Sequence, residues 1–310
     1  MSAPARIAAF AVGLALLFTA ATVAGGAVDP DVDDGPGEHG MESEESTMNG
    51  HETMSADTGA LPGLATSQAG YRIVPAATTA PAGPRTPYEF TIVGSDGEPL
   101  TEYAVEHERR MHLIVVRRDF AGFQHVHPEL AADGTWSAAI DTRLPGTYRV
   151  FADFTTAAAE SMTLGADLSV PGRVDPTPLP APAPTVDAGD GYEVTVTSEP
   201  ETEAATRLEF AVTRDGRPIE RVQPYLGADG HLVVLREGDL AFLHAHPQGE
   251  PGGAGPIAFD VDYPSAGAYR LYLQFRHGGA VHTAGFTELV AARGATSSEG
   301  HNGVEANHGH

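Results

Sequence analysis

Short runs of alternating apolar and polar residues recur along residues 66–293, and they predict β-strands. Examples are YEFTIV, HLIVV, WSAAID and TYRVFADF. In such a run every second side chain faces the same side of a sheet. Turn-forming sequences such as Ser-Asp-Gly and Pro-Gly separate the runs. Since no run shows the period of 3.6 residues that indicates a helix, the pattern predicts an all-β chain.

The strand pattern occurs twice. YEFTIVGSDGEPL matches LEFAVTRDGRPI further along the chain, and LPGTYRVFADF matches SAGAYRLYLQF. About seven strands in roughly 100 residues are typical of an immunoglobulin-like Greek-key sandwich. Tyr148 and Tyr269 follow a glycine just before a late strand, which predicts the tyrosine corner of such sandwiches. We therefore expect two tandem immunoglobulin-like β-sandwich domains from an internal duplication, with disordered tails.

The ends of the chain differ in composition from this repeated part. Residues 7–28 are uncharged and follow Arg6, which predicts a secretory signal peptide or an uncleaved membrane anchor. We expect an exported protein, extracellular or held in the cell envelope. The expected order is a signal peptide or anchor (1–28), a disordered acidic tail with His and Met residues (29–65), the first sandwich (66–172), a proline-rich linker (173–187), the second sandwich (188–293) and a disordered His-containing tail (294–310).

Charge and cysteine content narrow the possible partners. The chain has 42 acidic and 18 basic residues, a net charge of −24, which disfavours nucleic acid as a partner. It has no cysteine, so any bound metal must be held by His, Met or carboxylate ligands rather than thiolate.

Three histidines recur at the same spacing in both copies, as His-x12-His-x-His-Pro. They are His112, His125 and His127 in the first copy, and His231, His244 and His246 in the second.

The spacing indicates a common site in each copy. His125 and His127 are two residues apart, so in a strand they project from one face, with Cβ atoms roughly 7 Å apart. His112 lies on the preceding strand, opposite either 125 or 127 across a hairpin. Three imidazoles placed this way could reach one cation at a ligand distance of about 2 Å. We therefore expect a metal ion as the partner, with one site per domain.

A fourth ligand is suggested by aligning the last strands through Thr163 and Thr283. This alignment places Met162 and His282 at equivalent positions. A thioether or an imidazole there would suit copper, which is the expected metal, with zinc as the alternative.

Other functions remain open on this evidence. The histidines could be partly buried structural residues of a tandem sandwich that acts in adhesion. We expect no enzyme, because the chain lacks the H-E-x-x-H and G-x-S-x-G motifs. Glu129 beside the first motif corresponds to Gln248 beside the second, so the copies share no general base.

The motif strings resemble those of a group of secreted bacterial proteins, chiefly actinobacterial. The second copy reads GHLVVLREGDLAFLHAHP and the first MHLIVVRRDFAGFQHVHP. Such proteins are loosely described as heavy-metal or copper binding. The resemblance implies sandwich domains and copper handling, which would serve metal buffering or resistance outside the cytoplasm.

Overall fold

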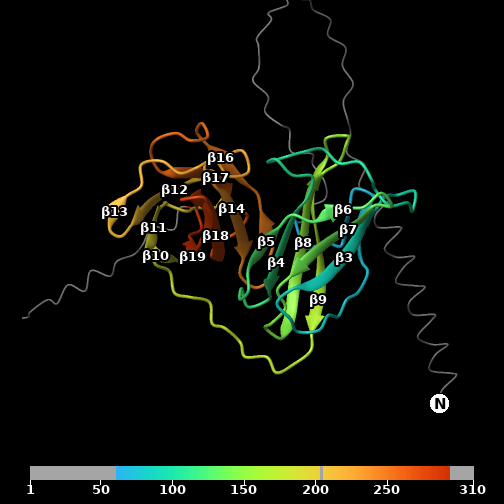
Figure 1. Ribbon diagram of the computed structural model, residues 1–310. Helices are drawn as coiled ribbons and strands as arrows, with labels where there is room; N and C mark the ends of the chain where they lie inside the picture. Colours follow the sequence, from blue (N-terminus) through green and yellow to red (C-terminus); the bar gives the residue numbers. More distant parts are fainter. Residues whose placement is uncertain (1–60, 203–204, 294–310) are drawn as a thin grey trace, which may run out of the picture. The chain divides into compact units, whose positions relative to one another are not determined.

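The computed structural model describes residues 61–202 and 205–293, and that part of the chain folds into β-strands and loops (Figure 1). All of these residues belong to one compact unit. Across these two ranges, no helix is long and apolar enough to cross a membrane. The expected signal peptide or anchor, most of the acidic tail and the C-terminal tail lie outside the described residues.

The first repeat forms two antiparallel sheets. One has the order β1 (Ser67–Gln68), β2 (Tyr71–Pro75), β3 (Thr86–Val93), β7 (Thr135–Ile140), β6 (Glu129–Leu130). The other has the order β5 (Gln124–Val126), β4 (His112–Arg117), β8 (Gly146–Thr155), β9 (Ser161–Val170).

The second repeat forms the same pair of sheets. One has the order β10 (Thr185–Gly189), β11 (Tyr192–Thr197), β12 (Ala205–Arg214), β17 (Ile257–Asp262), β16 (Ala245–Gln248), with β13 (Arg217–Pro218) beside β12. The other has the order β15 (Phe242–Leu243), β14 (His231–Arg236), β18 (Gly267–His277), β19 (Ala280–Val290). These orders are those of an immunoglobulin-type sandwich, so the expected fold class is confirmed.

Alternation along the strands places the core of each sandwich. In β3, Tyr88, Phe90 and Ile92 are buried while the residues between them are more exposed. They belong to the first core, which also contains Trp136; a second core is centred on residues such as Phe210 and Phe259. Each such side chain contributes roughly 1.5–3 kcal/mol when fully buried.

Strand β4 departs from alternation, because all six of its residues are buried. Leu113 and Val115 face the first core, whereas Ile114 and Val116 belong to a third apolar cluster that draws on both repeats. The members of this inter-repeat cluster are Ile114, Val116 and Phe151 from the first repeat, and Val233, Leu235, Leu240, Phe242 and Tyr272 from the second. The outer faces of β4 and β14 therefore both face the other repeat.

Both predicted tyrosine corners are present. The Tyr148 hydroxyl donates to the carbonyl of Leu144 at 2.7 Å, and the Tyr269 hydroxyl donates to that of Ser265 at 2.8 Å. Each bond ties the loop before the strand to the strand itself.

The folded part begins earlier in each repeat than the sequence indicated. Residues 61–65, placed in the acidic tail, lie against β9: Gly63 N–H donates to Thr163 O and Gly165 N–H donates to Ala65 O, both at 2.9 Å. In the second repeat β10 starts at Thr185, inside the expected linker, and pairs with β11.

Candidate metal centre

The β4–β5 hairpin brings the first three histidines together. Leu113 lies opposite Val126 and Ile114 opposite His125, so continuing the ladder sets His112 opposite His127. This is the second of the two registers that the spacing allowed. Because His112, Ile114 and His125 share one face of the hairpin, the imidazoles project away from the first core.

An aspartate in the turn explains why the hairpin closes at this point. Arg117 Nε donates to Asp119 Oδ1 at 2.7 Å, and the backbone N–H of Ala121 donates to the same oxygen at 3.3 Å. In the second repeat Asp239 receives equivalent bonds from Arg236 Nε and Ala241 N–H. An aspartate that accepts backbone and side-chain bonds in this way stabilises a tight turn.

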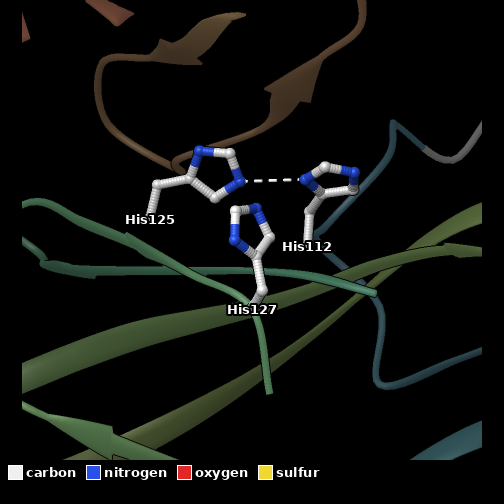
Figure 2. A group of neighbouring side chains, drawn as sticks. All are labelled: His112, His125 and His127. Carbon is white, nitrogen blue, oxygen red and sulfur yellow. Dashed lines mark hydrogen bonds between the residues drawn. The ribbon is translucent and has the colours of Figure 1, made fainter. Parts of the chain in front are cut away.

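Figure 2 shows the three imidazoles turned toward a common point. His112 Nδ1 and His125 Nε2 are 2.9 Å apart, and one ring nitrogen from each of the three residues lies within 4.8 Å of the others. In the described ranges, this is the one group of three or more His, Cys, Asp or Glu side chains that meets that spacing.

Burial keeps these imidazoles neutral. It lowers the pKa of His125 to about 3, with a further contribution from His112, and the pKa of His127 to about 4 for the same two reasons. Burial also lowers the pKa of His112, against an opposing effect of Asp153. A neutral imidazole has a free lone pair, so all three side chains can act as metal ligands at neutral pH.

The outward-facing ring nitrogens have oxygen partners. His125 Nδ1 lies 2.7 Å from Gln274 Oε1, and His112 Nε2 lies 3.4 Å from the carbonyl of Glu106. Gln274 Nε2 donates to Thr283 Oγ1 at 3.3 Å, which turns the amide oxygen toward His125. His127 Nε2 is buried and has no hydrogen-bond partner in the described part of the chain.

The second repeat does not assemble a triad of its own. Its hairpin keeps the same register, with Val234 opposite Leu243, but β15 ends there. The chain then crosses into the other sheet, where His246 lies opposite Asp260 and is exposed. His244 is also exposed, with its Nε2 3.2 Å from Thr163 Oγ1.

His231, the remaining member of the second motif, lies with the first triad. Its ring stacks on that of His112, with centroids 5.2 Å apart and an interplanar angle of 8°, and lies 4.5 Å from that of His125. Burial, reinforced by the neighbouring histidines, lowers its pKa well below the usual value.

Met162 and His282 do not lie with the histidine group. The ladders support the alignment that selected them, since Thr163 pairs with Asp153 and Thr283 with Gln274. The residue before each threonine, however, faces the opposite side of its sheet. Met162 is buried in the first core, and His282 packs against Tyr192, with ring centroids 4.1 Å apart.

Comparison with known proteins gives the family of both repeats. Residues 66–171 and 185–292 each match the family described as a domain of unknown function (DUF8832). The chain belongs to the DUF8832 family. Among curated proteins, none matches the chain.

Solved structures similar to this DUF8832 chain include two adhesins and an integrin-binding protein, all bacterial. The Escherichia coli adhesin FdeC is 15% identical over 71% of this chain and 64% of its own, with a TM-score of 0.24. The Yersinia pseudotuberculosis adhesin InvE is 13% identical over 70% of this chain and 58% of its own, with a TM-score of 0.23. Invasin, a bacterial integrin-binding protein, is 15% identical over 71% and 40%, with a TM-score of 0.22. The chain spans less than two thirds of each, and at these scores the likeness supports no inference about it.

Two neighbours of the site were not among the predicted residues. His107 sits in a turn with φ of 46°, and its ring centroid is 6.1 Å from those of His112 and His231. Gln274 pairs with His231, and Asp153 occupies the equivalent position opposite His112 in the first repeat. Neither His107 nor Gln274 has an identical residue in the other repeat, so the duplication did not identify them.

Proposed function

We propose that this DUF8832 protein binds a copper ion, or failing copper a zinc ion, through His112, His125 and His127. Its role would be metal buffering or resistance outside the cytoplasm, with residues 7–28 directing export. The role is binding rather than catalysis. The observation that carries the proposal is that one ring nitrogen of His112 lies 2.9 Å from one of His125, while the other nitrogen of each ring has an oxygen neighbour.

A neutral imidazole has one N–H donor and one acceptor nitrogen. If His112 and His125 each donate outward, to Glu106 O and Gln274 Oε1, their inner nitrogens are both unprotonated. Those two nitrogens are 2.9 Å apart, and two lone pairs at that distance repel each other. If one inner nitrogen is protonated to remove the repulsion, its ring can no longer donate to its outer oxygen. Without a cation, the pair cannot satisfy all of its nitrogens.

A metal ion at the inner nitrogens removes this conflict. Both inner lone pairs bind the ion, and both outer N–H groups keep an oxygen acceptor. Histidine ligands in metal sites usually donate their second N–H in this manner, which fixes the tautomer. Two nitrogens on one tetrahedral ion with bonds of 2.0–2.1 Å lie roughly 3.3 Å apart. The His112–His125 separation of 2.9 Å is close to that value, and the nitrogens of all three residues lie within 4.8 Å of one another.

His127 provides independent support. Burying an unpaired polar nitrogen costs about 1–3 kcal/mol, and His127 Nε2 is buried without a partner among the described residues. Ligation by a metal would give this nitrogen a partner.

The donor set favours late first-row metals. Imidazole nitrogen suits copper and zinc, whereas calcium and magnesium prefer oxygen. The net charge of −24 would raise the local cation concentration. The tails lie outside the described residues, and we propose that their histidines and methionines capture ions loosely near the folded site.

Calorimetric titration of the full chain with Cu(II) and with Zn(II) tests this function. In the double variant His125→Ala with His127→Ala, the affinity for the one tightly bound metal ion should fall by more than about 100-fold, because two of three ligands are gone. His246→Ala is the matched control, since it removes an exposed imidazole, and it should keep the wild-type affinity. A wild-type chain with no tight site beyond what the double variant retains would overturn the proposal.

A further inference from the structure

The candidate site does not belong to the first repeat alone. His231 starts β14 in the second repeat, yet its ring lies against two members of the triad, 5.2 Å from His112 and 4.5 Å from His125. His112 and His231 are equivalent residues of the duplication, each the first residue of its strand. Equivalent histidines therefore stack on each other where the two repeats meet.

Strand pairing and burial explain this stacking. On β4 the face turned away from the first core carries His112, Ile114 and Val116. On β14 the face turned away from the second core carries His231, Val233 and Leu235. The four apolar members of these two sets belong to the inter-repeat cluster. Tyr272 strengthens the contact, since its ring stacks on Phe123 at 3.9 Å and its hydroxyl donates to Phe120 O at 2.6 Å. The apolar contact thus holds the two first-position histidines face to face.

The second repeat also supplies the residue that orients His125. Gln274 on β18 accepts the Nδ1–H of His125 at 2.7 Å and is itself held by Thr283. Gln274 pairs with His231 across the sheet. One side chain that contacts the triad and one that positions it therefore come from neighbouring strands of the other repeat.

The ring nitrogens of His231 are not among those that lie within 4.8 Å of one another, so binding the same ion would require its ring to move. We propose that His231 is a fourth ligand, so that the chain holds one ion between its repeats rather than one ion in each. This inference rests on the proposed function, and it assigns the ion a second role as a cross-link between the two sandwiches. The site consists of four imidazoles without a thiolate or a carboxylate ligand, which suits a copper or zinc ion. Because the ion binds the docked arrangement of the repeats, it also stabilises that arrangement.

Metal titration of the full chain with Cu(II) and Zn(II) separates this inference from the proposed function. We expect one tight equivalent in the wild type. His231→Ala and the more conservative His231→Gln should each weaken it by at least 10-fold. The matched control is His244→Ala, which removes the counterpart of His125 in the second repeat; it should change the affinity by less than about twofold.

The outcomes are distinct. Absence of a tight site in the wild type overturns the proposed function and this inference together. Wild-type affinity in both His231 variants overturns the inference alone, and so do two tight equivalents of which one disappears in His244→Ala. If the His231 variants do not fold, the nitrogen hyperfine splitting in the electron paramagnetic resonance spectrum of the Cu(II)-loaded wild type decides. Four imidazole nitrogens on the ion are expected, and three would overturn the inference.

Discussion

The histidines of the site are individually ordinary, and their chemistry arises from their mutual placement. Burial disfavours the charged form of each ring, and every neighbouring imidazolium would raise that cost further. The group is therefore neutral at physiological pH, and each ring has one nitrogen with a free lone pair. A neutral donor set of this kind can bind a cation without first losing protons.

The metal-free protein should lose stability as the pH falls from about 6.5 toward 4. An unfolded histidine has a pKa of about 6.5, while the folded pKa values of His125 and His127 are about 3 and about 4. Below pH 6.5 the unfolded chain therefore takes up protons that the folded chain does not. Each such histidine lowers the free energy of unfolding by up to about 1.4 kcal/mol per pH unit. Urea denaturation across this range measures the slope.

The control for this prediction is a pair of variants. His125→Gln should show a shallower loss of stability with falling pH, because one depressed imidazole is gone. His246→Ala, at an exposed position outside the group, should follow the wild type. Identical slopes in the wild type and His125→Gln would contradict the assigned protonation states.

The point at which the chain crosses from one sheet to the other decides where each histidine points. In the first repeat β5 continues to Val126 and the second sheet is joined only at Glu129. In the second repeat β15 ends at Leu243 and β16 begins at Ala245. The earlier crossover moves His246 onto the edge of the other sheet, even though the hairpin turns match. A small difference in where pairing stops therefore gives the two copies of one motif different surroundings.

Close packing of the segment 61–65 on β9 gives a second prediction. A Cβ at Gly165 would lie 2.1 Å from Gly63 O and 2.4 Å from a guanidinium nitrogen of Arg149. That guanidinium also donates to the carbonyls of Gly63 and Leu64. Gly165→Ala should therefore destabilise the first sandwich by about 1–3 kcal/mol. Urea denaturation followed by the fluorescence of Trp136, the chain's one tryptophan, measures the loss.

Gly83→Ala is the matched control for this substitution. There the nearest atom to an added Cβ is Thr86 Oγ1 at 3.2 Å, a side-chain atom that can shift slightly. We expect a smaller change than at position 165. Equal stability of Gly165→Ala and the wild type would mean that residues 61–65 do not pack on β9 as described.

For the molecule as a whole, the contact between the repeats is part of the fold. The inter-repeat cluster is as buried as the two sandwich cores, and the stacked pair of Phe123 and Tyr272 adds a hydrogen bond to Phe120 O. Two sandwiches joined by an apolar contact of this kind should unfold as a single cooperative unit.

Tyr272→Ala should uncouple the repeats. The change removes an aromatic side chain that is 5% exposed, together with its hydroxyl bond, at a cost of about 3–5 kcal/mol. Trp136 fluorescence reports on the first repeat, whereas circular dichroism reports on both. The two transitions should coincide in the wild type and separate in the variant. Leu289→Ala, at an exposed residue of β19, should leave them coincident, and coincident transitions in Tyr272→Ala would contradict independent folding of the halves.

Sequence pattern alone predicts the strands, the duplication, both tyrosine corners and the hairpin that gathers His112, His125 and His127. These features depend on alternation, turn residues and spacing, which act over a few neighbouring residues. Packing in three dimensions sets the rest: His231 lies against the first group, His244 and His246 do not form a second one, and Met162 and His282 face the cores. Because β4 and β14 are apolar on both faces, periodicity cannot distinguish the face that packs within a sandwich from the one that meets the other repeat.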